Sequence, residues 1–102
     1  MEWLKERMWI SQYLTRGDEI YEEIYKHKHN GMNLEIKLRQ IQPYQHNVVS
    51  QIWRSTGCLK YFHETEFSGE NAYIRASSYV EMKKVELECI VDKVCESICK
   101  DG

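Results

Sequence analysis

The sequence is 102 residues long, with 42% apolar residues, 29% charged residues and a formal net charge of −2. These values predict one globular domain and exclude a disordered chain, and the interleaved charges disfavour nucleic-acid binding, which usually needs a basic face. No stretch reaches the roughly 18 apolar residues of a membrane helix, and charged residues interrupt the apolar N-terminus where a signal peptide would be unbroken, so we expect a cytoplasmic protein.

Residues 1–42 are predicted to form N-terminal helices. Apolar residues three or four apart, with acidic residues near the start, indicate a first helix over residues 2–14. A second amphipathic pattern covers residues 18–28, and residues 34–42 are rich in Leu, Glu, Lys, Arg and Gln, which are good helix formers. Helix is therefore the predicted state of most of this segment.

Asn30 and Gly31 are the clearest break in the segment, and they permit two interpretations. In one, the helix stops at the pair or continues through it at a cost of about 1 kcal/mol for the glycine. In the other, Asn-Gly forms a tight hairpin turn, and residues 32–38 alternate apolar and polar side chains as a strand does. The helix-forming composition of 34–42 favours the first interpretation.

Residues 43–70 form a variable middle region in which the pattern is mixed. Pro43 ends the preceding element, because the residue before a proline is pushed out of the helical region. Residues 48–53 fit one face of a short helix, whereas residues 58–63 are aromatic and follow a Ser-Thr-Gly turn, which suits a strand. A short β-hairpin across 48–63 is therefore an alternative to helix in this region.

Residues 71–100 are predicted to form one long C-terminal amphipathic helix. The segment 71–99 contains no Pro and no Gly, and it would be about 40 Å long at roughly 1.5 Å per residue. Its apolar stripe alternates steps of four and three residues, the spacing of helices paired in a coiled coil. The residues predicted for this core or dimer seam are Val80, Leu87, Val91, Val94 and Ile98.

The predicted fold class is mainly α. We expect one domain over residues 1–102, built as a small helical bundle or hairpin with the long C-terminal helix, with the β-hairpin in the middle as an alternative. A homodimer paired along the C-terminal stripe is also expected, because so long a stripe in a small chain needs a partner to cover it.

Zinc is the sharpest cofactor hypothesis, and the spacing argues against it. Thiolate and imidazole are suitable ligands for tetrahedral zinc, but the sequence has no Cys-x2-Cys knuckle, and a cysteine beside an apolar stripe is usually a small buried residue. We therefore expect no metal and no cofactor. The residues of this disfavoured site are Cys58, His63, Cys95 and Cys99.

The pair His27 and His29 is disfavoured as a metal site for a different reason. Two residues apart, they point to different sides of a helix and share a face only on a strand. Catalysis is also not expected: Cys58 and His63 could be drawn as a thiol nucleophile with its base, but no glycine-rich turn for an oxyanion accompanies them, and no phosphate-binding loop is present. No catalytic residue is predicted.

Aromatic residues are the remaining signal, at 12% of the chain. Such side chains anchor both cores and protein interfaces. We predict Trp9, Trp53 and Tyr61 as residues that contact a protein partner.

The two ends of the chain share a set of apolar positions and short motifs: Trp3-Leu4, Tyr13-Leu14, Asp18-Glu19-Ile20, Ile24, Leu38-Arg39, Glu70-Asn71-Ala72, Val85-Glu86-Leu87-Glu88, Ile90-Val91, Val94 and Ile98. With these residues the chain resembles small helical proteins encoded by phages and prophages of Gram-positive bacteria. In that family an N-terminal helical hairpin is followed by a helix-turn-helix segment similar to sigma factors, and its members are regulators of late phage genes. The present sequence ends where that DNA-reading segment would begin, so DNA binding is not carried over.

This resemblance implies a small protein that acts by occupying a larger machine. The first functional hypothesis is a non-enzymatic, phage-encoded inhibitor of a host defence nuclease, such as an anti-CRISPR protein, acting by steric occupation in the host cytoplasm. The alternative is an accessory protein of phage transcription regulation that binds the transcription machinery and works as a helical dimerisation module.

Overall fold

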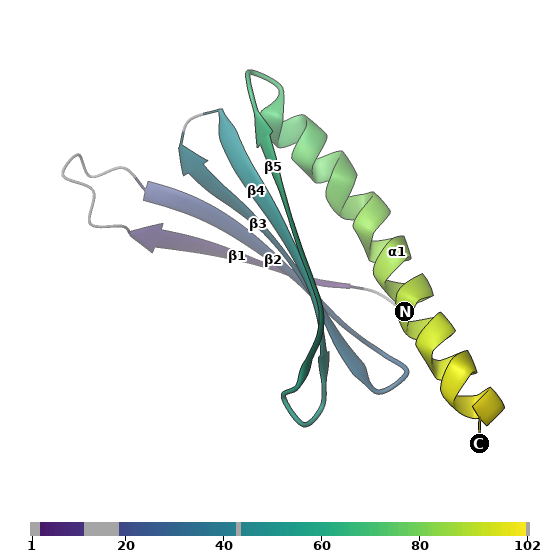
Figure 1. The fold of residues 1–102 in the computed structure, drawn as a ribbon. Helices are drawn as coiled ribbons and strands as arrows, with labels where there is room; N and C mark the ends of the chain where they lie inside the picture. Colours follow the sequence, from purple (N-terminus) through teal and green to yellow (C-terminus); the bar gives the residue numbers. More distant parts are fainter. Residues whose placement is uncertain (1–2, 12–18, 43, 102) are drawn as a thin grey trace.

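The computed structural model describes the backbone of residues 3–11, 19–42 and 44–101, and the side chains of residues 3–7, 22–41 and 44–93. In this part of the chain, five consecutive strands form one twisted antiparallel sheet, ordered as in the sequence, and a helix follows them (Figure 1). The elements are β1 (Leu4–Ser11), β2 (Glu19–His29), β3 (Met32–Gln42), β4 (Gln45–Arg54), β5 (Leu59–Ser68) and α1 (Ala72–Asp101).

The predicted mainly α fold is wrong. The described parts of the segments predicted as helices over 2–14, 18–28 and 34–42 lie in strands β1, β2 and β3. Asn30 and Gly31 form the turn between β2 and β3, with φ angles of 50° and 80°. Both angles lie in the left-handed region that a tight hairpin turn requires, so the hairpin alternative is the correct one.

Strand β3 shows why the helix prediction failed. Leu34, Ile36 and Leu38 are almost completely buried, while Glu35 and Lys37 between them are partly exposed on the other face. Leu, Glu and Lys favour helix intrinsically, but that preference is worth only tenths of a kcal/mol per residue. Burying an alternating row against a helix contributes far more, at about 1.5–3 kcal/mol for each large apolar side chain.

The middle region is a β-hairpin, so the predicted short helix over 48–53 is wrong and the hairpin alternative across 48–63 is correct. It is longer than expected, because β4 and β5 pair from Gln45 opposite Ser68 to Trp53 opposite Leu59. On β4, Val48 and Ile52 are buried in the core. The hairpin turns at Gly57, where φ is 95°.

The C-terminal helix lies where the sequence predicts it, but its stripe has a different partner. Val80, Leu87 and Val91 are buried in one hydrophobic cluster with β3 and β4 residues of the same chain. The predicted coiled coil and helical bundle are therefore wrong, because this stripe packs on a sheet. The side chains of Val94 and Ile98 lie outside the described residues.

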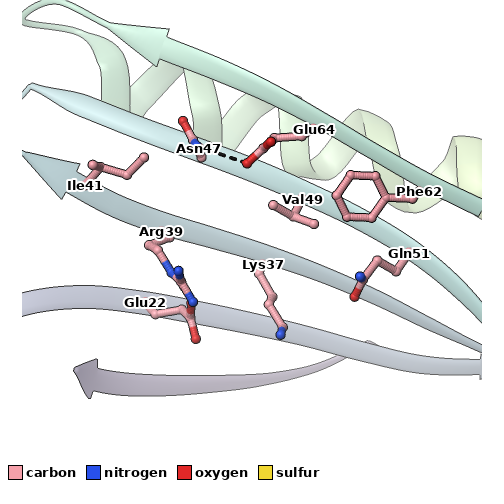
Figure 2. Close-up of a pocket in the computed structure, with 9 residues that line it drawn as sticks. All are labelled: Glu22, Lys37, Arg39, Ile41, Asn47, Val49, Gln51, Phe62 and Glu64. Atoms are coloured by element: carbon pink, nitrogen blue, oxygen red, sulfur yellow. Dashed lines mark hydrogen bonds and ion pairs between the residues drawn. The ribbon is translucent and has the colours of Figure 1, made fainter. Parts of the chain in front are cut away.

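Helix α1 covers only one face of the sheet (Figure 1). Its backbone packs mainly against β3, β4 and β5, and its side chains also reach β2. Among the described elements, none lies over the opposite face, which we call the uncovered face (Figure 2). The side chains that alternate with the buried core residues point to it.

Candidate functional site

The residues predicted to contact a partner lie in different places. Trp53 is on the uncovered face and is partly buried. Tyr61 is on the helix side of β5, where its hydroxyl accepts a hydrogen bond of 2.9 Å from Lys83. The side chain of Trp9 lies outside the described residues. The fold thus presents Trp53 on the surface left open by the helix and gives Tyr61 a contact within the chain.

A shallow hollow of about 330 Å³ lies on the uncovered face (Figure 2). Its walls come from four adjacent strands, because antiparallel pairing places residues of one face in rows across the sheet. The lining combines apolar, amide and charged side chains: Glu22, Lys37, Arg39, Ile41, Asn47, Val49, Gln51, Phe62 and Glu64.

The basic side chains of the hollow have acidic partners. Arg39 Nε donates to Glu22 Oε2 at 2.7 Å, and Glu22 is buried although Arg39 is not. Lys37 Nζ lies 3.5 Å from Glu35 Oε1. These pairs offset positive charge across β2 and β3, so the centre of the face carries no basic stripe of the kind that binds a phosphate backbone.

The acidic side chains of β5 are different. Glu64 accepts a hydrogen bond of 3.1 Å from Asn47, and Glu66 accepts one of 2.7 Å from Gln45. Both donors are neutral amides, which orient the carboxylates without neutralising them. The edge strand therefore presents negative charge at one side of the hollow.

Apolar side chains continue from this negative edge toward the turn between β4 and β5. Phe62 and Leu59 are 54% and 42% exposed, and Trp53 pairs with Leu59 across the two strands. Aromatic and aliphatic groups exposed together are typical of protein-binding surfaces. Phe62 was missed from the sequence, although it alternates with Tyr61, His63 and the rest of the helix-facing row of β5 and so could have been assigned to the opposite face.

The helix side of the sheet holds a buried ionic network around Glu23. The Glu23 carboxylate is fully buried and accepts hydrogen bonds from Lys5 at 2.6 Å, Tyr73 at 2.7 Å and Tyr25 at 3.2 Å. Burial alone would raise the pKa of Glu23, but the bonds from Lys5 and the two tyrosines outweigh it and lower the pKa below its usual value. The network joins β1, β2 and α1, which is a structural role.

The disfavoured cysteine and histidine set is not brought together among the described residues. Cys58 is exposed in the turn before β5, and its sulfur lies 3.9 Å from the Leu59 carbonyl oxygen. His63 Nδ1 lies instead 3.4 Å from the Tyr79 hydroxyl. The side chains of Cys95 and Cys99 lie outside the described residues.

The histidine pair that the fold does assemble is His27 and His29. Both are on strand β2 and face α1, and their ring centroids are 5.8 Å apart. Their predicted divergence rested on a helix over 18–28, and the strand reverses it, because side chains two apart on a strand share a face.

No family model, curated protein or solved structure matches this chain. Within the residues that the structure describes, α1 has no run of apolar side chains sufficient to cross a lipid bilayer.

Proposed function

We propose that this chain is a non-enzymatic binding protein that occupies the surface of a larger protein through its uncovered face. The observation that carries the proposal is the one-sided sheet: the chain's own helix buries one face, and the other presents the exposed Phe62 beside the carboxylate of Glu64, with Glu66 further along the same strand. Because helix α1 packs on the opposite face, the sheet holds these groups at fixed positions, which limits the conformational entropy lost on binding.

The charges define the chemistry of the partner. Glu64 and Glu66 have only amide partners among the described residues, so a complementary surface supplies Lys or Arg there and apolar groups opposite Phe62. A basic, apolar-walled channel of a nucleic-acid enzyme has this chemistry. An inhibitor of a host defence nuclease in the bacterial cytoplasm, the class implied by the phage resemblance, would act by blocking such a channel.

The alternative, a transcription accessory acting as a helical dimerisation module, has less support than steric inhibition. It needs the Val80, Leu87 and Val91 stripe to be free for a second helix, and this stripe is buried against the sheet of the same chain.

Affinity capture from a Gram-positive lysate containing a CRISPR nuclease, followed by nuclease assays with the captured enzyme, tests the proposal. Phe62→Asp and the double variant Glu64→Lys/Glu66→Lys alter the uncovered face. Ile74→Asp is the matched control, because Ile74 is exposed to a similar extent, 65%, on the helix. We expect the wild type and the control to bind and inhibit the nuclease, and both face variants to lose binding at least tenfold.

The ionic component gives a second criterion. Pairing of Glu64 and Glu66 with basic groups predicts weaker binding as salt is raised. Capture that is equally strong in all variants, or that Ile74→Asp alone abolishes, would refute the uncovered face as the working surface. Self-association of the purified chain that Phe62→Asp abolishes would assign the face to a second copy instead.

A further inference from the structure

Two histidines and two carboxylates meet between strand β2 and helix α1. His27 and His29 are two residues apart on β2, next to the Asn30–Gly31 turn, and both side chains point toward the helix. Glu88 and Asp92 are four residues apart on α1, so they lie on one face of the helix. Packing of the helix across the sheet brings the two pairs together.

The separations between the donor atoms are close to those around a bound metal ion. His27 Nε2 lies 3.4 Å from Glu88 Oε1, close to the separation of roughly 3.3 Å between neighbouring ligands of a tetrahedral zinc ion with bonds of about 2.0–2.1 Å. One nitrogen of each histidine and one oxygen of Glu88 all lie within 4.8 Å of one another. Small side-chain rotations would place all three atoms around one ion.

The ring nitrogens available to such an ion are buried and make no hydrogen bond to the described residues. The His27 side chain is only 4% exposed, and its Nε2 makes no hydrogen bond with any side chain or backbone group that the structure describes. His29 Nδ1 is also buried without a partner. A buried ring nitrogen without a hydrogen bond is costly, and coordination of a cation removes that cost for both rings.

The groups behind the histidines and Glu88 are those that orient metal ligands. Asp92 Oδ1 lies 2.8 Å from His29 Nε2 and accepts a 2.7 Å bond from Asn30, so Asp92 holds the proton on Nε2 and leaves the lone pair on Nδ1. Trp3 Nε1 donates to Glu88 Oε1 at 3.1 Å. A carboxylate bound to the far nitrogen of a histidine is the usual outer shell of a zinc ligand.

We infer that His27 Nε2, His29 Nδ1 and the Glu88 carboxylate form a binding site for a divalent transition metal, with Zn²⁺ as the expected ion. Two imidazoles and one carboxylate suit Zn²⁺, whereas Mg²⁺ and Ca²⁺ prefer oxygen ligands alone. Asp92 positions His29, and water completes the coordination. The ion would fasten helix α1 to the β2–β3 hairpin, which is a role separate from the uncovered face on the other side of the sheet.

Calorimetric titration of tag-free, reduced protein with ZnCl₂ tests the site. His29→Gln and Glu88→Gln each remove one ligand while keeping a polar side chain, and the two changes are also combined. His63→Gln is the matched control, since His63 is an exposed histidine on the same side of the sheet. Melting curves of every variant without metal establish that each is folded.

We expect the wild-type chain to bind one Zn²⁺ and to melt at a higher temperature with zinc. The zinc affinity should be at least tenfold lower in each single variant, and the double variant should not bind zinc. The zinc affinity of His63→Gln should equal that of the wild type. Co²⁺ in the wild type should give the visible bands of a nitrogen and oxygen site without thiolate charge transfer, a readout that needs no variant. Absence of zinc binding, binding that survives in the double variant, or a thiolate spectrum would each overturn the assignment.

Discussion

Replacement of Leu87 by alanine tests whether the helix stripe is buried within one chain. Leu87 has no exposed surface and packs in the cluster shared by α1, β3 and β4. Truncation of a buried leucine typically costs about 2–5 kcal/mol, because it removes apolar contacts and leaves a cavity. We take about 3 kcal/mol as the expected loss of unfolding free energy for Leu87→Ala.

This loss is large enough to measure and small enough to leave a folded protein, since domains of this size are stable by about 5–15 kcal/mol. With a urea m-value of about 1–3 kcal/mol/M, the midpoint should fall by roughly 1–3 M. The melting temperature should fall by about 12–24 °C, at roughly 4–8 °C for each kcal/mol. The assay is urea unfolding followed by helix circular dichroism.

Val85→Ala is the matched control, because Val85 is on the same helix and is 62% exposed. Its effect should stay within about 0.5 kcal/mol. Burial within one chain also predicts a urea midpoint that does not depend on protein concentration. Equal effects of the two substitutions, or a midpoint that rises with concentration, would show that the stripe is covered by a second molecule.

Two further changes probe the sheet. Burial lowers the pKa of His46 below its ordinary 6.5, although the charge of Glu23 opposes the shift. As the pH falls, the unfolded chain therefore binds a proton at this histidine before the folded chain does, so the stability due to neutral His46 is present above pH 6.5 and is lost below it. Between about pH 7 and pH 5, the urea midpoint should fall less in His46→Gln than in the wild type, and an equal fall in both proteins would contradict this. Gly31→Ala should lower the free energy of unfolding by about 1–2 kcal/mol, measured by urea unfolding, because φ at this position is +80°. An added Cβ would meet no atom within 4 Å, so backbone strain is the whole effect. Gly31→Asn should lower it less, and a Gly31→Ala variant as stable as the wild type would exclude a strained turn.

The candidate sites were only partly predictable. Trp53 was expected at a partner surface and lies on the uncovered face, where its role stays a prediction. Phe62 and Glu64 were not singled out: the alternation of β5 places them on the face opposite Tyr61, but only the packing of α1 shows that this face is the uncovered one. The residue spacing correctly predicted that His27 and His29 would share a face only on a strand. Glu88, however, is 59 or more positions away in the sequence, and no local spacing links it to them.

The sequence by itself determined the features that depend on local chemistry. A long segment without Pro or Gly formed the C-terminal helix, and Asn30-Gly31 carried the signal of a tight turn. Only the tertiary structure decided that the five described segments β1 to β5 form a sheet. Strand β3 contains good helix formers and also alternates apolar and polar residues, so its two local preferences nearly balance. Burial of Leu34, Ile36 and Leu38 beneath α1 decides between them, because that free energy exceeds any difference in local propensity.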